Sequence, residues 1–229
     1  MLETKQLVII GGGSSIQEGI SKDLWSKLEN KFVIGLNYSY KYFSNPTVQC
    51  FVDHEFYSKE YDDLKSLGLI IGKSQKTLKL HDNTITMTCS GQYNRDVRKA
   101  VYKASLVGIF ALSLGIYLLD EGEIFLLGYD FGELTTEKDA KNRVITHFYQ
   151  GQTEHRGIGK NSYYNISNKA NDDFKVYSKE TRCKIYNVSM KSKIDIFDKI
   201  SYDEFFTKLD KNIINNEEIR KDIRNKLTL

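Results

Sequence analysis

A glycine-rich turn near the start of the sequence contains the first residues suited to chemistry. The turn consists of Gly11, Gly12, Gly13, Ser14 and Ser15. Glycines let backbone N–H groups approach an anion without an intervening Cβ, and a helix that follows them directs its positive end to the same place. The serine hydroxyls can cap that helix and donate hydrogen bonds. The pattern indicates a phosphate-binding turn; the alternative is a tight strand-to-helix turn with serine caps alone.

Other polar residues follow short apolar runs of the sequence. Asn37 and Asp53 each end such a run, and Gly128, Tyr129 and Asp130 end a third. If these runs are parallel strands, their carboxyl ends lie at one edge of the sheet, where open α/β proteins bind their ligands. We therefore expect all these residues to border one site together with the glycine turn. Local capping of strand ends is the alternative for Asn37 and Asp53.

Asp53 is the candidate metal ligand, because an aspartate at a strand end can hold a divalent cation that bridges phosphates. One carboxylate does not make a metal site. Asp130 is the candidate second ligand, although the first role expected for it is to brace the loop backbone. The sequence therefore predicts a nucleotide or nucleotide sugar as ligand, with Mg²⁺ as an optional second cofactor.

Residues 135–164 are polar, aromatic and punctuated by glycines, which is typical of a functional loop or lid. The segment contains His147, Tyr149, His155 and Arg156. A histidine can act as general base toward an acceptor hydroxyl, and a tyrosine or arginine can donate to a departing phosphate. We expect one of the two histidines to be the base, with Tyr149 near the leaving group. The alternative is that both histidines are exposed and without function.

The segments that must position these residues alternate between apolar strands and helix-like patterns. This order predicts an α/β fold, a Rossmann-like open and mostly parallel sheet with helices on both faces and a lid-like insertion. With no evident linker, residues 1–229 are expected to form a single domain with a C-terminal helical tail at 201–229. The expected strands are 7–10, 32–36, 48–52, 68–72, 184–188 and a run ending at Gly128; the expected helices are 16–28, 97–117, 168–183 and 202–227; residues 77–89 are expected to form a hairpin or meander.

Composition limits the function further. The 33 basic and 30 acidic residues are interspersed, so a nucleic-acid partner is not favoured, whereas a small anionic ligand is compatible with the net charge of +3. Cys50, Cys89 and Cys183 form no metal-type pair and suit a reducing, cytoplasmic setting. The longest apolar run is too short and too mixed to predict a transmembrane segment. Whether the protein forms a homo-oligomer is left open.

Three segments of the sequence together resemble a known group of proteins. They are VIIGGGSSI, VIGLNYSYKYF and KASLVGIFALSLGIYLLDEGEIFLLGYDF, with a looser likeness in CKIYNVSMKSKIDIF. They resemble the bacterial sialyltransferases of glycosyltransferase family 42 and, at a similar distance, the archaeal 6-hydroxymethylpterin pyrophosphokinases and their microbial and viral relatives. The resemblance covers roughly residues 6–56 and 98–133.

The resemblance implies a nucleotide monophosphate leaving group bound by the glycine turn and Asn37. It adds Ser90 and Gly91 as further contacts near the base of the long helix. In the sialyltransferases an asparagine stands at the second position of the turn, where this sequence has Gly12. That departure argues against cytidine specificity, while Asp53 suits the pyrophosphokinase branch better.

Several classes of function follow from these observations. The leading hypothesis is a nucleotide-dependent transferase that takes a glycosyl group from a nucleotide-sugar donor to an unidentified acceptor. The second is a metal-dependent, pyrophosphokinase-like phosphoryl-transfer enzyme, and the third is a nucleotide-binding module without activity. A dehydrogenase ranks last, because the glycine fingerprint is incomplete and Asn37 stands where an acidic residue would hold the ribose.

Overall fold

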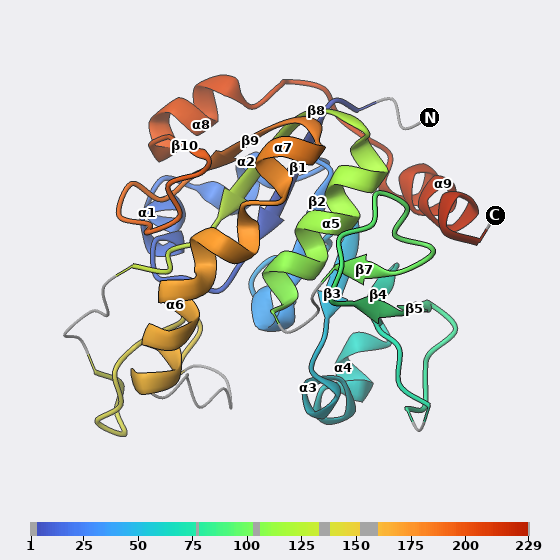
Figure 1. Ribbon diagram of the computed structural model, residues 1–229, viewed down its shortest axis with the longest axis horizontal. Coiled ribbons are helices and arrows are strands. Elements are labelled where there is room, and N and C mark those ends of the chain that lie inside the picture. Colours follow the sequence, from blue (N-terminus) through green and yellow to red (C-terminus); the bar gives the residue numbers. More distant parts are fainter. Residues whose placement is uncertain (1–3, 77, 103–105, 133–137, 152–159, 229) are drawn as a thin grey trace.

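The computed structural model describes residues 4–76, 78–102, 106–132, 138–151 and 160–228. Within these residues, eight strands form one sheet in the order β10-β9-β8-β1-β2-β3-β4-β5, and every neighbouring pair is parallel (Figure 1). The strands are β1 (Gln6–Ile10), β2 (Val33–Leu36), β3 (Val48–Phe51), β4 (Ile70–Lys73), β5 (Thr84–Met87), β8 (Glu121–Leu127), β9 (Arg182–Asn187) and β10 (Asp198–Lys199). The predicted Rossmann-like α/β fold is confirmed.

The central strands are mostly apolar because both of their faces are covered. All four residues of β2 and of β3 are buried, as are the last four of β1. Such runs are typical of parallel sheets that lie between two layers of helices. Strands β2 to β5 follow one another on one side of β1, and β8 to β10 follow on the other side. The chain therefore leaves β1 and β8 in opposite directions, and the carboxyl ends of β1, β2 and β8 meet at this point. This is the position at which such sheets bind ligands.

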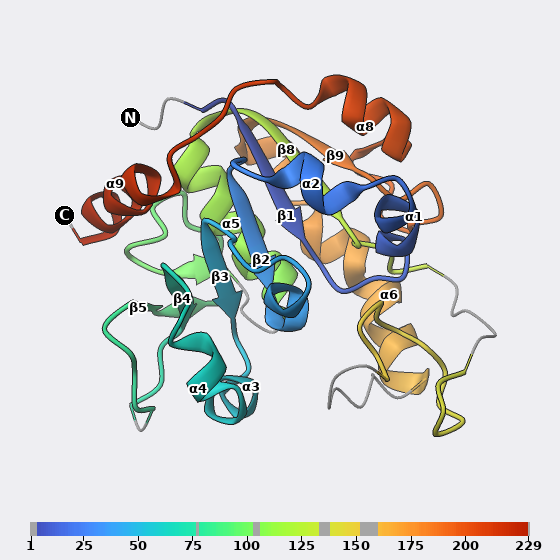
Figure 2. The same ribbon diagram turned by 180° about the vertical axis from the view of Figure 1, so that it is seen from behind.

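Helices cover both faces of the sheet. The face toward the viewer in Figure 1 carries α5, α6 and α7, and the opposite face, seen in Figure 2, carries α1, α2 and α8. Each face has its own cluster of buried apolar side chains. The helices are α1 (Ile16–Ser21), α2 (Leu24–Leu28), η1 (Asn37–Lys41), α3 (His54–Lys59), α4 (Tyr61–Leu64), α5 (Val107–Leu119), α6 (Lys160–Phe174), α7 (Tyr177–Glu180), α8 (Tyr202–Lys208) and α9 (Asn216–Thr228).

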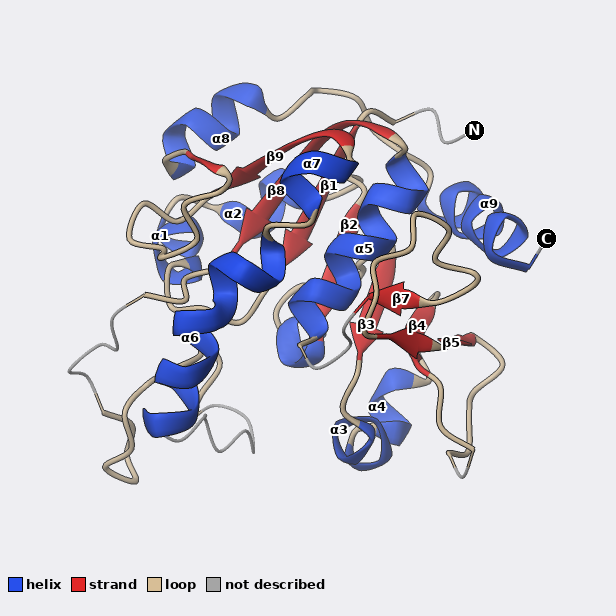
Figure 3. Cartoon of the chain, in the orientation of Figure 1, coloured by secondary structure: helices blue, strands red, loops and turns tan. Residues whose placement is uncertain are grey.

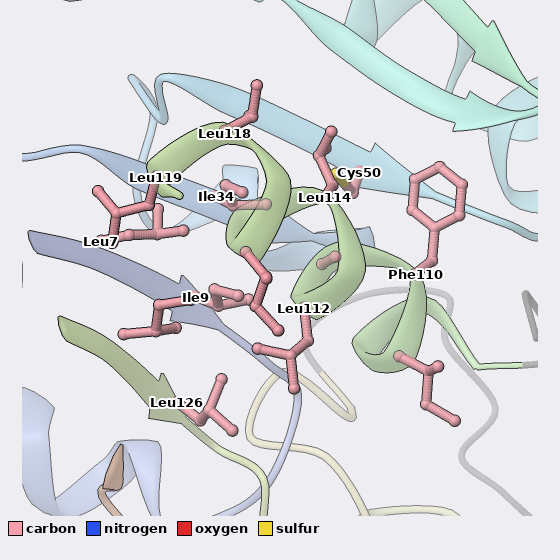
Figure 4. Close-up of a cluster of buried hydrophobic side chains, with 14 of the residues drawn as sticks. Leu7, Ile9, Ile34, Cys50, Phe110, Leu112, Leu114, Leu118, Leu119 and Leu126 are labelled. Carbon is pink, nitrogen blue, oxygen red and sulfur yellow. The ribbon is translucent and has the colours of Figure 1, made fainter. Parts of the chain in front are cut away.

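Helix α5 is the centre of one of these layers. Ten of its thirteen residues are buried, so it is apolar on almost every side rather than along one stripe. Leu112 and Leu114 belong to the same buried cluster as the sheet residues Ile9 and Ile34 (Figure 4). Tyr177 of α7 contacts another side of the helix, where its hydroxyl lies 2.7 Å from that of Ser113. The hydroxyl of Tyr177 donates to the carbonyl of Ile109 over 3.1 Å. The helix is therefore held firmly, and its first turn has a fixed place at the edge of the sheet.

The predicted hairpin at residues 77–89 is wrong. Strand β5 pairs with β4 in parallel, so the chain between them crosses back along the sheet instead of turning sharply (Figure 3). His81 fixes this crossing, because its ring stacks on Tyr61 at 3.7 Å and its Nε2 lies 2.7 Å from the Tyr61 carbonyl. Alternation of apolar and polar residues marked the strand correctly, but it carries no information on strand direction.

The predicted helix at residues 97–117 begins ten residues late. Within it, β7 (Val101–Tyr102) pairs with β6 (Cys89–Ser90) in a small second sheet, and α5 starts only at Val107. The predicted helix at 16–28 is also interrupted, because Asp23 has a φ of 63° and separates α1 from α2. In both places the helical spacing of apolar residues was real, but local backbone geometry divided the segment.

The segment expected to be a lid is partly helical. Residues 160–164 already belong to α6, which replaces the start predicted at residue 168. Residues 138–151 are a loop in which an antiparallel bridge joins Lys138 to Val144. None of the helices in the described residues combines the length and the apolar composition that crossing a bilayer requires.

The C-terminal helices are integrated into the fold rather than forming a loose tail. Tyr202 and Phe205 of α8 and Ile219 and Ile223 of α9 are buried in the two apolar clusters. Arg220 is 5% exposed and donates to the carbonyls of Pro46 and Thr47 over 2.8 and 3.1 Å. These bonds tie α9 to the loop that leads into β3.

Candidate functional site

A cavity of about 380 Å³ opens at the carboxyl edge of the sheet, and we call it the nucleotide cavity after the ligand that the sequence predicts. It combines residues from the ends of β1, β2, β3 and β8 with the start of α5, the loop 138–151 and α6. Its lining is Gly11, Gly12, Gly13, Leu36, Asn37, Val52, Asp53, Leu106, Val107, Gly108, Gly128, Tyr129, Asp130, Phe131, Thr146, His147, Tyr149, Tyr163 and Ile166. The strand-end residues Asn37, Asp53 and Asp130 therefore meet at one cavity, and their role in binding stays a prediction.

The glycine turn is already filled in part by a carboxylate of the protein. Asp130 accepts a hydrogen bond from the backbone N–H of Ser15 over 2.9 Å and another from the Ser15 hydroxyl over 2.5 Å. A Cβ on Gly13 would lie 2.5 Å from this carboxylate. Asp130 thus braces the turn, the structural role expected first for it, and takes the place at the start of α1 that suits an anion.

This arrangement moves the expected phosphate position. The N–H groups of Gly11, Gly13 and Ser15 donate to the Leu127 carbonyl, the Gly128 carbonyl and Asp130, which leaves at most two of the five turn N–H groups for a ligand. A ligand phosphate beside Asp130 would also meet a like charge. The turn therefore shapes the cavity wall more than it offers a complete anion cradle.

His147 lies directly against the turn. A Cβ on Gly12 would be 2.4 Å from its Cδ2 and 3.3 Å from its Nε2, and 2.9 Å from the hydroxyl of Tyr149. The rings of His147 and Tyr149 stack with centroids 5.2 Å apart. Gly12 is therefore required by packing, because the space of any side chain at this position is taken by His147 and Tyr149. An asparagine side chain, as in the resembling sialyltransferases, would therefore not fit at this position.

Hydrogen bonds in the loop orient His147. The side-chain amide of Gln150 donates to the Val144 carbonyl over 2.9 Å, so its oxygen is the acceptor toward Thr146. The Thr146 hydroxyl lies 3.1 Å from that oxygen and 2.8 Å from Nδ1 of His147. When the hydroxyl donates to Gln150 it accepts from Nδ1, and this tautomer of the neutral ring has its lone pair on Nε2.

Phe148 anchors this loop on the opposite side of the turn. Its N–H donates to the Gly12 carbonyl over 2.9 Å, and its ring packs against Tyr42 and Trp25 with centroid distances of 5.0 and 6.3 Å. Farther along the loop, Arg143 pairs with Asp139 at 2.6 Å and holds the pKa of that carboxyl well below its usual range. The loop is thus docked on the site.

Asn37 and Tyr149 are neighbours in the cavity wall. Asn37 has a φ of 48°, a left-handed conformation that asparagine tolerates better than most residues. Its side chain hydrogen bonds to Tyr149, and its buried Oδ1 has no partner within the described residues. Burial raises the pKa of Tyr149, so its phenol stays protonated near neutral pH and can donate a hydrogen bond. An unpaired buried acceptor at a cavity is suited to a ligand donor.

Asp53 is at the cavity rim and caps α3. Its carboxylate accepts from the N–H of Glu55 over 2.9 Å, which is the local capping role named as the alternative. Among the described residues, no group of three or more histidine, cysteine, aspartate or glutamate side chains is placed to hold a metal ion. Its metal role stays a prediction.

Two predicted contacts lie elsewhere. Ser90 is in β6, where its hydroxyl accepts from the N–H of Gln92, and Gly91 is exposed; the cavity lining includes neither, although both are described. They are separated from the cavity because the chain first passes through β7. His155 lies outside the described residues, so its role stays a prediction.

The first turn of α5 was not among the predicted site residues. Leu106, Val107 and Gly108 line the cavity, and among the described residues no side chain caps this helix end. A thirteen-residue helix directs a partial positive charge to this place. The apolar run that begins at residue 106 indicates this helix start, but the prediction placed the start at residue 97.

The resemblance in the sequence finds no independent support. No protein-family model matches the chain, and no curated protein is significantly similar to it. The geometry of the cavity is therefore the basis for a functional conclusion.

Proposed function

We propose that the protein is a nucleotide-dependent transferase that moves a glycosyl group from a nucleotide-sugar donor to a hydroxyl acceptor. The observation that supports this most is the placement of His147. The ring edge with Cδ2 and Nε2 lies against Gly12, in a cavity also lined by Asn37, the three turn glycines and the start of α5. A cavity of about 380 Å³ is within the range of small-ligand sites.

In the proposed reaction, the acceptor oxygen attacks the anomeric carbon while the bond from that carbon to the donor phosphate breaks. Nε2 of His147 takes the hydroxyl proton, in the tautomer whose Nδ1 donates to the Thr146 hydroxyl 2.8 Å away. The phenol of Tyr149 donates to the departing phosphate, and the N-terminal end of α5 stabilises its charge. The three free cysteines suit the cytoplasmic setting that we propose with this function.

A second candidate is phosphoryl transfer with a divalent cation. It is favoured by one observation: Asp53 and Asp130 line the same cavity. Asp53 would hold the ion, which would neutralise and align the phosphates of a nucleotide. Asp130 suits this role less, since both of its oxygens are already engaged by Ser15.

Thermal unfolding in the presence of candidate ligands tests the proposal. Nucleosides, nucleotides and nucleotide sugars are compared, with and without Mg²⁺, because a ligand that binds only the native state raises its stability. We expect at least one nucleotide sugar to raise the Tm, and Asn37→Ala to weaken its binding by about 1 kcal/mol or more. Asn37→Gly, which relieves the strained backbone but also removes the amide, should show the same weakening.

If no nucleotide or nucleotide sugar changes the Tm, the proposal is wrong at the level of ligand class. If binding occurs without any turnover or donor hydrolysis, the protein is a binding module instead.

A further inference from the structure

A second cavity, of about 600 Å³, adjoins the nucleotide cavity. Asp130, Thr146 and Tyr163 line both cavities and form their common boundary. We call the second one the lysine cavity, because Lys191 and Lys193 belong to its wall. The remaining lining residues are Ser14, Ser15, Glu18, Gly132, Ile145, Ser189 and Met190.

The two cavities differ in charge. Every described residue in the lining of the nucleotide cavity is neutral or acidic, apart from His147, so lysine and arginine are absent from it. In the lysine cavity, both acidic residues already have partners: Glu18 pairs with Lys22 at 3.4 Å, and Asp130 accepts from Ser15. Within the described part of the chain, Lys191 and Lys193 form no ion pair.

The backbone that carries the two lysines is fixed against the end of β8. The N–H of Lys193 donates to the Asp130 carbonyl over 3.1 Å, and the Lys193 carbonyl accepts from Asn171 over 2.7 Å. The buried hydroxyl of Ser192, between the lysines, donates to the Tyr129 carbonyl over 2.7 Å. Only the side chains of the lysines therefore need to be ordered when a ligand binds, which lowers the entropic cost of binding.

We propose that Lys191 and Lys193 bind the anionic part, a phosphate or a carboxylate, of a substrate whose other end occupies the nucleotide cavity. The assignment of that other end rests on the proposed function. An anion in the nucleotide cavity meets Asp53 and Asp130 with no lysine or arginine in the described lining, whereas in the lysine cavity Lys191 and Lys193, which form no ion pair within the described residues, offset the charges of Asp130 and Glu18. Ser189 contributes a hydroxyl to the same wall, while the Ser14 hydroxyl donates to Asp130 over 3.4 Å.

Binding of a graded set of ligands to the double variant Lys191→Ala/Lys193→Ala tests this subsite. The set consists of inorganic pyrophosphate, a nucleoside, its mono- and diphosphate, and nucleotide sugars with a neutral or a carboxylate-bearing sugar. The double variant Lys65→Ala/Lys221→Ala is the control, because it removes the same charge from exposed positions outside both cavities. Calorimetry at low and at high salt measures each affinity.

We expect the lysine-cavity variant to bind pyrophosphate and the anionic ligands at least about tenfold more weakly, with the nucleoside unchanged within twofold and a reduced salt dependence. If the variant binds the nucleoside normally but loses affinity for the mono- or diphosphate, the nucleotide phosphate is the anion that the lysines bind. A loss confined to the acidic sugar identifies its carboxylate.

Equal affinities of the variant and the wild type for every anionic ligand would overturn the proposal, and so would a wild-type protein that binds none of them. If pyrophosphate binds through the lysines but no nucleoside or nucleotide sugar binds, the subsite stands and the proposed function fails. If nucleotide sugars bind without any contribution from the lysines, the function stands and the subsite fails.

Discussion

At the scale of single residues, the proposed chemistry depends on one histidine whose ring is held by its neighbours. Gln150 accepts from the N–H of Thr146, and the proposal has the Thr146 hydroxyl accept a hydrogen bond from Nδ1 of His147. The lone pair of the proposed base is then on Nε2, at the ring edge that lies against Gly12. In this proposal the loop supplies both the base and the hydrogen bonds that orient it.

Replacing His147 with Ala is expected to lower kcat for transfer, or for donor hydrolysis, about 100-fold or more, since general bases contribute about 10²–10⁴ to rates. Donor affinity should change less than threefold, because the base acts mainly in the transition state. Single-turnover kinetics and calorimetry measure the two effects. The same substitution at His155 is the comparison, and full activity of the His147 variant would refute this mechanism.

At the scale of elements, the strand ends and the loop differ in how far sequence could predict them. Asn37, Asp53 and Asp130 were expected to meet because the carboxyl ends of parallel strands share one edge. The contact between His147 and Gly12 could not be foreseen, since it depends on Phe148 entering the aromatic group of Trp25 and Tyr42. Apolar runs and their alternation with helical segments indicate the sheet, but no comparable pattern indicates where a loop docks.

The docking of the loop predicts the effect of Phe148→Ala. Removing a buried Phe side chain costs about 3–5 kcal/mol when the surroundings stay in place. A loop can instead detach locally, so we expect a smaller loss of global stability together with faster hydrogen exchange in residues 138–151. Nucleotide-sugar turnover should also fall in this variant, since His147 belongs to the same loop.

Phe206→Ala is the matched control for this loop, because Phe206 is partly buried and packs in the same apolar cluster without lining the nucleotide cavity. It should lower stability while leaving exchange in residues 138–151 and turnover close to wild type. If both variants change the loop equally, Phe148 has no special role in holding it.

At the scale of the whole molecule, charge is distributed unevenly along the carboxyl edge of the sheet. The nucleotide cavity carries Asp53 and Asp130, whereas the positive charge is displaced to the lysine cavity. Two means of neutralising a bound phosphate are consistent with this distribution. A divalent cation at Asp53 would act inside the nucleotide cavity, and lysines and helix dipoles would act from its borders.

Removal of divalent cations distinguishes these two means. Glycosyl transfer with His147 as base has no step that requires a cation. We therefore expect turnover in EDTA to remain within about threefold of turnover in Mg²⁺, because an exposed charge contact contributes little free energy. Asp53→Asn is the matching substitution, since asparagine caps a helix as well as aspartate does and the stability of α3 should not change. Its turnover should also stay near wild type. The opposite result is a loss of turnover of about 100-fold or more in EDTA that Mg²⁺ restores in the wild type but not in Asp53→Asn. It would establish the phosphoryl-transfer candidate, because the carboxylate would then be needed to hold the ion.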